Sequence, residues 1–116
     1  MAAAPVTHFE ITGKDGERLK TFYKSLFDWE IDSNNPMNYG LVKAAGKGIG
    51  GGISASEDGK NSLTFYAEVD NLQATLDKAV AMGGKVFVPV TEIPNMVTFA
   101  QLQDVAGNVV GIVKGM

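Results

Sequence analysis

The residues of this chain best suited to chemistry are a single histidine and carboxylates that alternate with apolar residues. His8 and Glu10 alternate with Thr7, Phe9 and Ile11. Because successive side chains of a β-strand point to opposite faces, this pattern places the imidazole and the carboxylate on the same face. Both groups can bind a polar ligand or exchange a proton with it, so His8 and Glu10 are the best candidates for catalysis.

The same period of two recurs later in the chain, in residues 63–69, 99–103 and 109–113. The mostly apolar set of each segment is expected to contact a helix, which leaves the polar set on a helix-free face. A face that combines carboxylates, aromatic rings and one imidazole has the composition of a small-molecule site. The alternative is a solvated sheet face. We predict that the ligand-binding residues are His8, Glu10, Thr64, Tyr66, Glu68, Phe99, Gln101 and Gly111.

Two amphipathic helices are expected to pack against these strands. The first spans about residues 15–28 and has Asp15 as its predicted N-cap. Its two predicted faces are an apolar one with Leu19, Phe22, Tyr23, Leu26 and Phe27 and a polar one with Arg18, Lys20, Lys24 and Ser25. The second helix carries Leu72, Leu76, Ala79 and Val80 on one face. Asp70 and Gln73 resemble a capping box at its start, and Gly83-Gly84 is a typical C-terminal stop.

The remaining β-prone segments make the order βαβββ appear twice. Strands are expected at residues 6–11, 29–31, 39–45 and 49–54, and again at 63–69, 86–90, 97–102 and 109–113. We predict an α+β fold within one domain, residues 1–116. It consists of two tandem βαβββ modules, about 5–57 and 60–114, which form a curved, cup-shaped mixed sheet with helices on the outer face. A ferredoxin-like βαββαβ domain is the alternative, although it leaves one strand after each helix unassigned.

Composition excludes several other classes of protein. The chain has 116 residues, of which 45% are hydrophobic and 20% charged, and it contains no cysteine. Thiolate nucleophiles, iron–sulfur clusters and disulfide scaffolds are therefore excluded. A net charge of −3 without a basic stripe argues against a nucleic-acid partner. No apolar stretch is long enough to span a membrane, and we expect a cytoplasmic protein. Each module leaves sheet edges exposed, which favours a homodimer.

Three stretches resemble the vicinal oxygen chelate superfamily, which includes glyoxalase I, bleomycin-resistance proteins and extradiol dioxygenases. They are His8-Phe-Glu-Ile11, the helical segment Leu19–Trp29 with its Phe-Tyr and Leu-Phe-x-Trp pairs, and Asp104-Val-Ala-Gly107-Asn108. The family usually has proline where this chain has Val105. The resemblance extends from about Val6 to Val113, and it implies two modules that close as a cup over a small-molecule site.

Members that use a metal take its ligands from the first and last strands of each module. The first-strand ligand matches His8, the equivalent in the second module matches Thr64, and the glutamate of the last strand falls on Gly111. The last strand of the first module, Gly48–Ile53, offers no carboxylate. A tight divalent-metal site needs three or four converging donors. We therefore predict no metal and no other cofactor.

Three functions are compatible with these residues. The leading one is a glyoxalase/bleomycin-resistance-like protein that binds a small organic molecule in the cup without metal. The first alternative is a lactoylglutathione-lyase-like or isomerase-type enzyme, in which His8 or Glu10 acts as the general base. The second alternative is a non-catalytic protein-interaction module.

Overall fold

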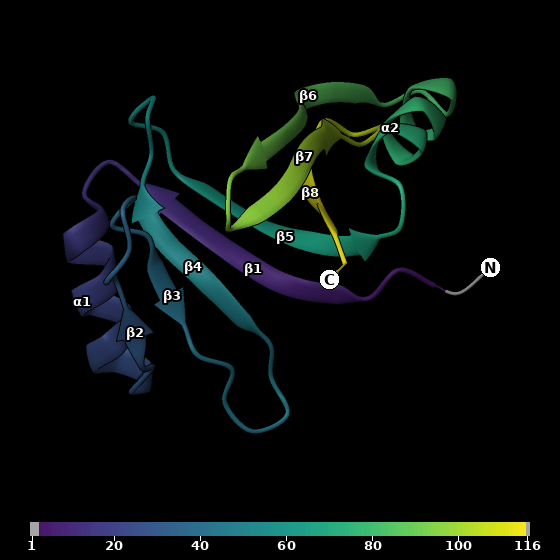
Figure 1. Ribbon diagram of the computed structural model, residues 1–116. Coiled ribbons are helices and arrows are strands. Elements are labelled where there is room, and N and C mark those ends of the chain that lie inside the picture. Colours follow the sequence, from purple (N-terminus) through teal and green to yellow (C-terminus); the bar gives the residue numbers. More distant parts are fainter. Residues whose placement is uncertain (1–2, 116) are drawn as a thin grey trace. The chain divides into compact units, whose positions relative to one another are not determined.

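The computed structural model describes residues 3–115 and divides into two compact units. One unit is residues 8–64, and the other comprises residues 65–116 with the first seven residues. Each unit contains most of one βαβββ module, because the boundaries between the units fall within the first strand of each module (Figure 1). The predicted α+β class with two such modules is confirmed in the described part of the chain, and three strands follow each helix there, which excludes the ferredoxin-like alternative.

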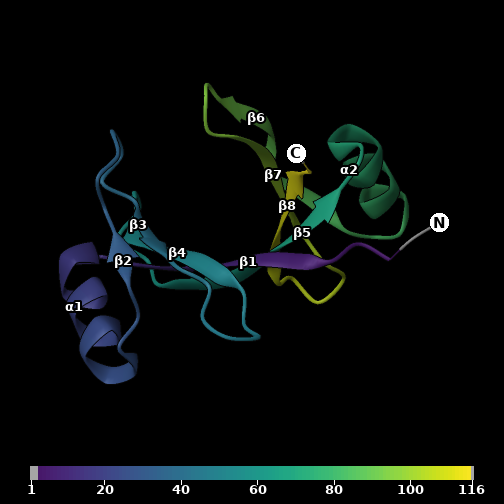
Figure 2. The same ribbon diagram turned by 60° about the horizontal axis from the view of Figure 1, so that its bottom comes forward.

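The first module consists of β1 (Val6–Gly13), α1 (Gly16–Phe27), β2 (Ile31–Asp32), β3 (Gly40–Val42) and β4 (Gly50–Ala55). Its strands lie in the order β2-β3-β4-β1, with β1 parallel to β4 and the other pairs antiparallel. Helix α1 lies beside β2 in Figures 1 and 2. Asp15 is the N-cap as predicted, because its carboxylate accepts a hydrogen bond from the Arg18 N–H at 3.0 Å.

The orientation of α1 differs from the prediction. Lys20 is buried, with 8% of its surface exposed, whereas Phe22, Leu26 and Phe27 are more than half exposed. The prediction that Lys20 lies on the solvent face is therefore wrong. The reason is that its ammonium finds acceptors on Glu17 and on the loop before β3, which offset the cost of burying a charge.

Aromatic rings provide the apolar contacts between α1 and the strands. The Trp29 ring lies 5.5 Å from the Tyr23 ring and stacks on it, and it lies 5.3 Å from the Phe9 ring. A Cβ atom at Gly51, the partner of Phe9 in β4, would meet the Phe9 ring. Glycine at position 51 therefore makes room for an aromatic ring on the helix side of β1, as the alternation predicts for Phe9.

The second module consists of β5 (Ser62–Val69), α2 (Leu72–Ala81), β6 (Lys85–Ile93), β7 (Val97–Gln103) and β8 (Val109–Lys114). Its strands lie in the order β5-β8-β7-β6, with β5 parallel to β8. The core cluster under α2 contains Leu72, Leu76, Ala100 and Ile112. The predicted alternation of β7 and β8 is confirmed by this cluster, because Ala100 and Ile112 face the helix.

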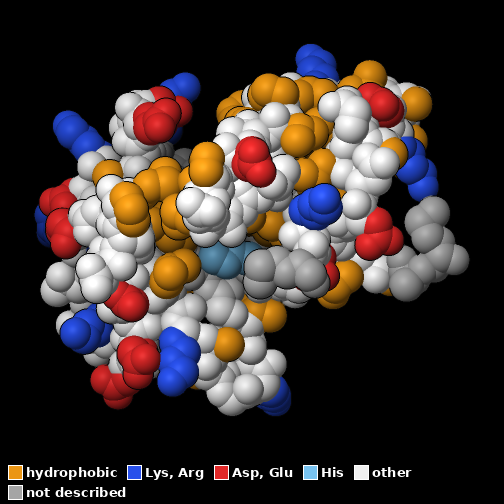
Figure 3. All heavy atoms as spheres, viewed as in Figure 1, with side chains coloured by type: hydrophobic (Ala, Val, Ile, Leu, Met, Phe, Trp, Pro, Cys, Tyr) orange, Lys and Arg blue, Asp and Glu red, His pale blue; other side chains and the backbone are white. Residues whose placement is uncertain are grey.

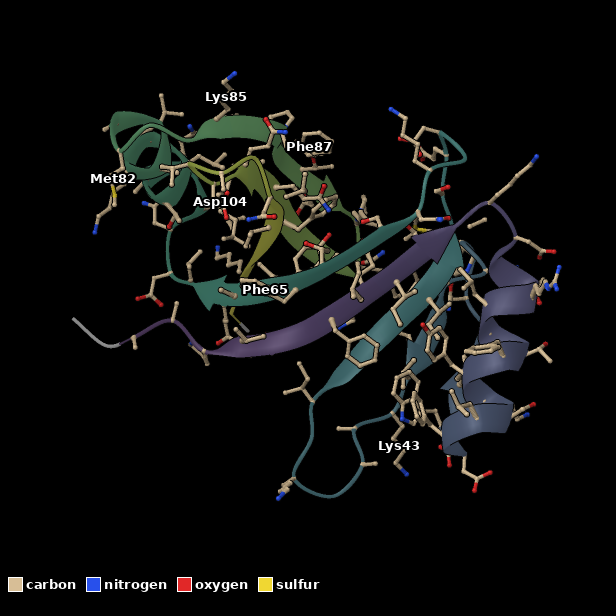
Figure 4. All side chains as sticks on the ribbon, turned by 180° about the vertical axis from the view of Figure 1, so that it is seen from behind. Lys43, Phe65, Met82, Lys85, Phe87 and Asp104 are labelled. Carbon is tan, nitrogen blue, oxygen red and sulfur yellow. The ribbon has the colours of Figure 1, made fainter. Side chains whose placement is uncertain are left out.

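The start of α2 is capped by a different residue from the one predicted. Asn71, not Asp70, is the N-cap, and its side chain accepts from the Ala74 N–H at 2.9 Å. The capping box of Asp70 and Gln73 is therefore wrong. Asn71 takes this position because its side-chain oxygen reaches the N–H three residues later, as an N-cap requires. Beyond the helix, Met82 is largely exposed and its side chain points outward (Figure 4).

The turn between β7 and β8 is built around Asp104 (Figure 4). Its carboxylate accepts from the side-chain amide of Asn108 and from the N–H groups of Asn108 and Ala106. These hydrogen bonds, first of all that from the Asn108 side chain, hold the pKa of Asp104 below its ordinary value. Gly107 takes a positive φ of 96°, which glycine adopts without strain. This geometry explains the Asp-x-x-Gly-Asn pattern.

Figure 3 shows hydrophobic side chains exposed over α2 and β6. Val80 of α2 and Val86 and Phe87 of β6 are among the exposed large hydrophobic residues. None of the helices in the described residues is both long and apolar enough to cross a membrane.

Candidate functional site

His8 and Glu10 lie in β1 opposite glycines of β4. In the parallel pairing His8 is the partner of Gly50, and Glu10 is the partner of Gly52. Since glycine has no side chain, the surface beside the imidazole and the carboxylate is open for a group from elsewhere in the module. His8 is half-buried and Gly52 is buried, so a group in this space is shielded from water.

Tyr39, the residue before β3, occupies this space. Its hydroxyl lies 2.9 Å from His8 Nε2 and donates a hydrogen bond to Glu10 Oε2, also at 2.9 Å. A Cβ atom at Gly52 would collide with the Tyr39 ring. We call His8, Tyr39 and Glu10 the β1 site.

The single hydroxyl proton of Tyr39 sets the direction of this chain of hydrogen bonds. Because that proton is donated to Glu10, the Tyr39 oxygen accepts from His8, and Nε2 of the imidazole carries a hydrogen. Burial lowers the pKa of His8 below its ordinary value of 6.5. The neutral imidazole is therefore the dominant form at pH 7.

The second module brings together another group of the predicted residues. The Gln101 side-chain amide donates to the Tyr66 hydroxyl at 2.7 Å, and the Phe99 ring lies 6.3 Å from the Tyr66 ring in an edge-on arrangement. The Tyr66 ring covers Gly111, its partner in β8. We call Tyr66, Phe99 and Gln101 the β5 site.

The other two predicted residues of β5 are Thr64 and Glu68, at a spacing of two on either side of Tyr66. Thr64 is buried. Glu68 is half-buried, and a Cβ atom at Gly115 would lie 2.5 Å from its carboxylate oxygen Oε1.

The two modules repeat one local arrangement, in which a tyrosine ring covers a glycine of the last strand. Tyr39 covers Gly52 beside Glu10, and Tyr66 covers Gly111. Sequence reasoning missed Tyr39, because it placed this residue within a strand. The signal that could have found it is the run Gly50-Gly51-Gly52, which leaves space on both faces of β4 for rings from neighbouring segments.

A family model described as a glyoxalase-like domain matches residues 8–113, nearly the whole chain. The chain belongs to the glyoxalase-like family. The resemblance recognised in the sequence is thereby confirmed.

A longer protein is similar in sequence to most of this glyoxalase-like chain. "Putative glyoxylase CFP32" of Mycobacterium bovis is 35% identical over 78 residues, which are 66% of this chain and 30% of that protein. This chain therefore spans only about a third of the length of that relative.

Solved structures share the fold at low identity. Methylmalonyl-CoA epimerase from Mycobacterium tuberculosis superposes with a TM-score of 0.67 at 13% identity, over 100% of this chain and 93% of its own. A glyoxalase/bleomycin resistance protein/dioxygenase superfamily member from Vibrio splendidus superposes with a TM-score of 0.62 at 12% identity, over 97% and 100%. Similarity at this identity shows the fold alone.

The residues of this glyoxalase-like domain do not fit the metal site that the resemblance implies. The position of the last-strand glutamate is Gly111, and the Tyr66 ring fills the space that a side chain there would need. Gly52 has the equivalent place in the first module and is covered by Tyr39. In residues 3–115, no three His, Cys, Asp or Glu side chains are grouped as metal ligands.

Proposed function

We propose that this glyoxalase-like domain binds a small organic molecule at the β1 site without a metal ion. The observation that carries the proposal is the hydrogen-bonded chain of His8, Tyr39 and Glu10, set over a glycine strand. These two hydrogen bonds orient an imidazole, a hydroxyl and a carboxylate on one sheet face. Such convergent polar groups are typical of ligand sites.

The charge of the β1 site favours a cationic, amine-bearing ligand. Strands β1 and β4 contain Glu10 but no lysine or arginine. A carboxylate attracts ammonium groups and repels anions. In the second module, the Tyr66 and Phe99 rings offer cation–π contacts to the same class of ligand.

Benzylamine, benzyl alcohol and benzoate, which share one ring and differ in charge, test this proposal. We expect benzylamine to bind best in titrations followed by calorimetry or NMR. Glu10→Gln should weaken benzylamine binding about tenfold, which corresponds to about 1.4 kcal/mol, because it removes the charge and keeps the shape. The matched control is Glu57→Gln, which removes the same charge from an exposed residue beyond β4. Tightest binding of benzoate, or equal loss in both variants, would contradict the proposal.

The affinity for benzylamine should also depend on pH through His8. Because burial lowers the pKa of His8, the imidazole stays neutral as the pH falls to 6.5. Below that lowered pKa it gains a positive charge next to the bound ammonium, and affinity should fall. In a His8→Gln variant this fall in benzylamine affinity should disappear. If the variant and the unmodified protein have the same pH profile, the ligand does not contact this site.

A proton-transfer enzyme is the second candidate, and the direction of the hydrogen bonds favours it. An imidazole that takes a proton from a substrate C–H can pass its Nε2 proton to Tyr39, while Tyr39 passes its own proton to Glu10. The proton then rests on the Glu10 carboxyl and the electron pair stays on the substrate. Exchange of the acidic C–H of methylmalonyl-CoA in deuterated water, lost in His8→Gln, would support this function over simple binding.

The absence of a metal, the cytoplasmic location and the homodimer stay predictions. One equivalent of nickel, zinc, manganese or iron in protein purified without chelator would overturn the first of them.

A further inference from the structure

The loop before β3 is held in place by side chains that the β1 site does not include. The Asn35 side chain bonds both backbone groups of Tyr39: its amide donates to the Tyr39 carbonyl at 2.7 Å, and its oxygen accepts from the Tyr39 N–H at 2.9 Å. This pair orients the backbone from which the tyrosine side chain extends. These two hydrogen bonds do not fix the backbone of the residue before Tyr39, which other contacts hold.

Asn38 sets the path of the chain just before Tyr39, because its backbone takes a left-handed conformation and it is hydrogen-bonded to two residues of α1. Its φ is +52°, in the left-handed region, which asparagine adopts more readily than other residues with a side chain. The Asn38 carbonyl accepts from Lys20 Nζ at 2.8 Å, and the Asn38 side-chain amide donates to Glu17 Oε2 at 3.1 Å. Lys20 Nζ in turn donates to the same Glu17 oxygen at 2.9 Å.

Lys20 therefore reaches from α1 to the residue that precedes Tyr39. Its side chain is 9% exposed, and its Cε atom borders Gly40, the residue after Tyr39, where a Cβ would lie 2.9 Å away. A buried ammonium with two acceptors on Asn38 and one on Glu17 is a rigid attachment point.

We infer that Lys20 is a positioning residue that holds the Tyr39 hydroxyl between His8 and Glu10. The inference deepens the proposed function and rests on it, since the place of Tyr39 affects a ligand only if the ligand binds at the β1 site. Without the ammonium, Asn38 loses the contact that supports its left-handed backbone, and the Tyr39 ring is free to leave the space over Gly52.

Lys20→Met tests this inference, because methionine keeps the apolar stem and removes the ammonium. We expect benzylamine affinity to fall about fivefold, a change of about 1 kcal/mol. The His8 titration, followed by NMR without any ligand, should move toward 6.5, because water replaces the Tyr39 ring beside the imidazole. Lys24→Met, an exposed lysine one turn later on the same helix, should change neither measurement.

A double-mutant cycle separates positioning of the Tyr39 hydroxyl from a general loss of stability. In a Tyr39→Phe background, Lys20→Met should change benzylamine affinity by less than about twofold, since the group it positions is already absent. An equal loss in both backgrounds, or a His8 titration that Lys20→Met does not move, would overturn the inference.

Two further measurements keep the test decisive. If Lys20→Met does not fold, Glu17→Gln weakens the same attachment from an exposed residue and should shift the His8 titration in the same direction. If the unmodified protein binds no benzylamine, the proposed function fails. The ligand-free His8 titration then still decides whether Lys20 positions Tyr39.

Discussion

Gly52→Ala is expected to lower the free energy of unfolding by about 2 kcal/mol, although the change adds a single methyl group to a strand. The added Cβ would occupy the place of the Tyr39 ring. The Tyr39 side chain must then move, which breaks the hydrogen bonds of its hydroxyl with His8 and Glu10 in a buried part of β4. Urea unfolding should show a lower midpoint with an unchanged slope, because the surface exposed on unfolding is nearly the same.

The matched control for Gly52→Ala is the same substitution in a Tyr39→Ala background. With the ring removed, the added methyl has space, and alanine in place of glycine should be neutral or stabilise by up to about 1 kcal/mol. An equal loss of stability in both backgrounds would mean that position 52 requires glycine for another reason. It would also mean that Tyr39 is not seated over this strand in solution.

Leu76→Ala is expected to lower the free energy of unfolding by about 2–5 kcal/mol, a large part of the stability of a domain of this size. Only 1% of the Leu76 surface is exposed, and the side chain lies in the cluster formed with Leu72, Ala100 and Ile112. Alanine leaves a cavity between α2 and the strands that the packed neighbours can fill only in part.

Val80→Ala is the matched control for Leu76→Ala. Val80 lies one turn later on the same helix and is 50% exposed, so its truncation should change stability by about 0.5 kcal/mol or less. Similar losses for both substitutions would mean that α2 does not pack on β7 and β8 through the face that contains Leu76.

Local patterns in the sequence predict most of the fold of this glyoxalase-like domain. The alternation around His8 and Glu10 places them together on one face of β1, because the period of two is a property of any extended chain. The cap at Asp15 follows in the same way, since a carboxylate at that position needs only the N–H three residues later. The apolar and polar sets of β7 and β8 are equally local in origin, as Ala100 and Ile112 show.

The candidate site is only partly predictable from such patterns. The alternation along the strands predicts which faces carry His8, Glu10, Tyr66 and Gln101, because the geometry of a strand decides the direction of its side chains. Tyr39 joins the β1 site through tertiary contacts that no local pattern shows. It lies 29 positions from Glu10 and meets it because β3 pairs with β4 and Gly52 leaves space for the ring. The tertiary structure made this contact. It also decided that Lys20 is buried. The helical period shows that α1 has an apolar and a polar face. The acceptors on Asn38, 18 residues after Lys20, determine that Lys20 turns inward.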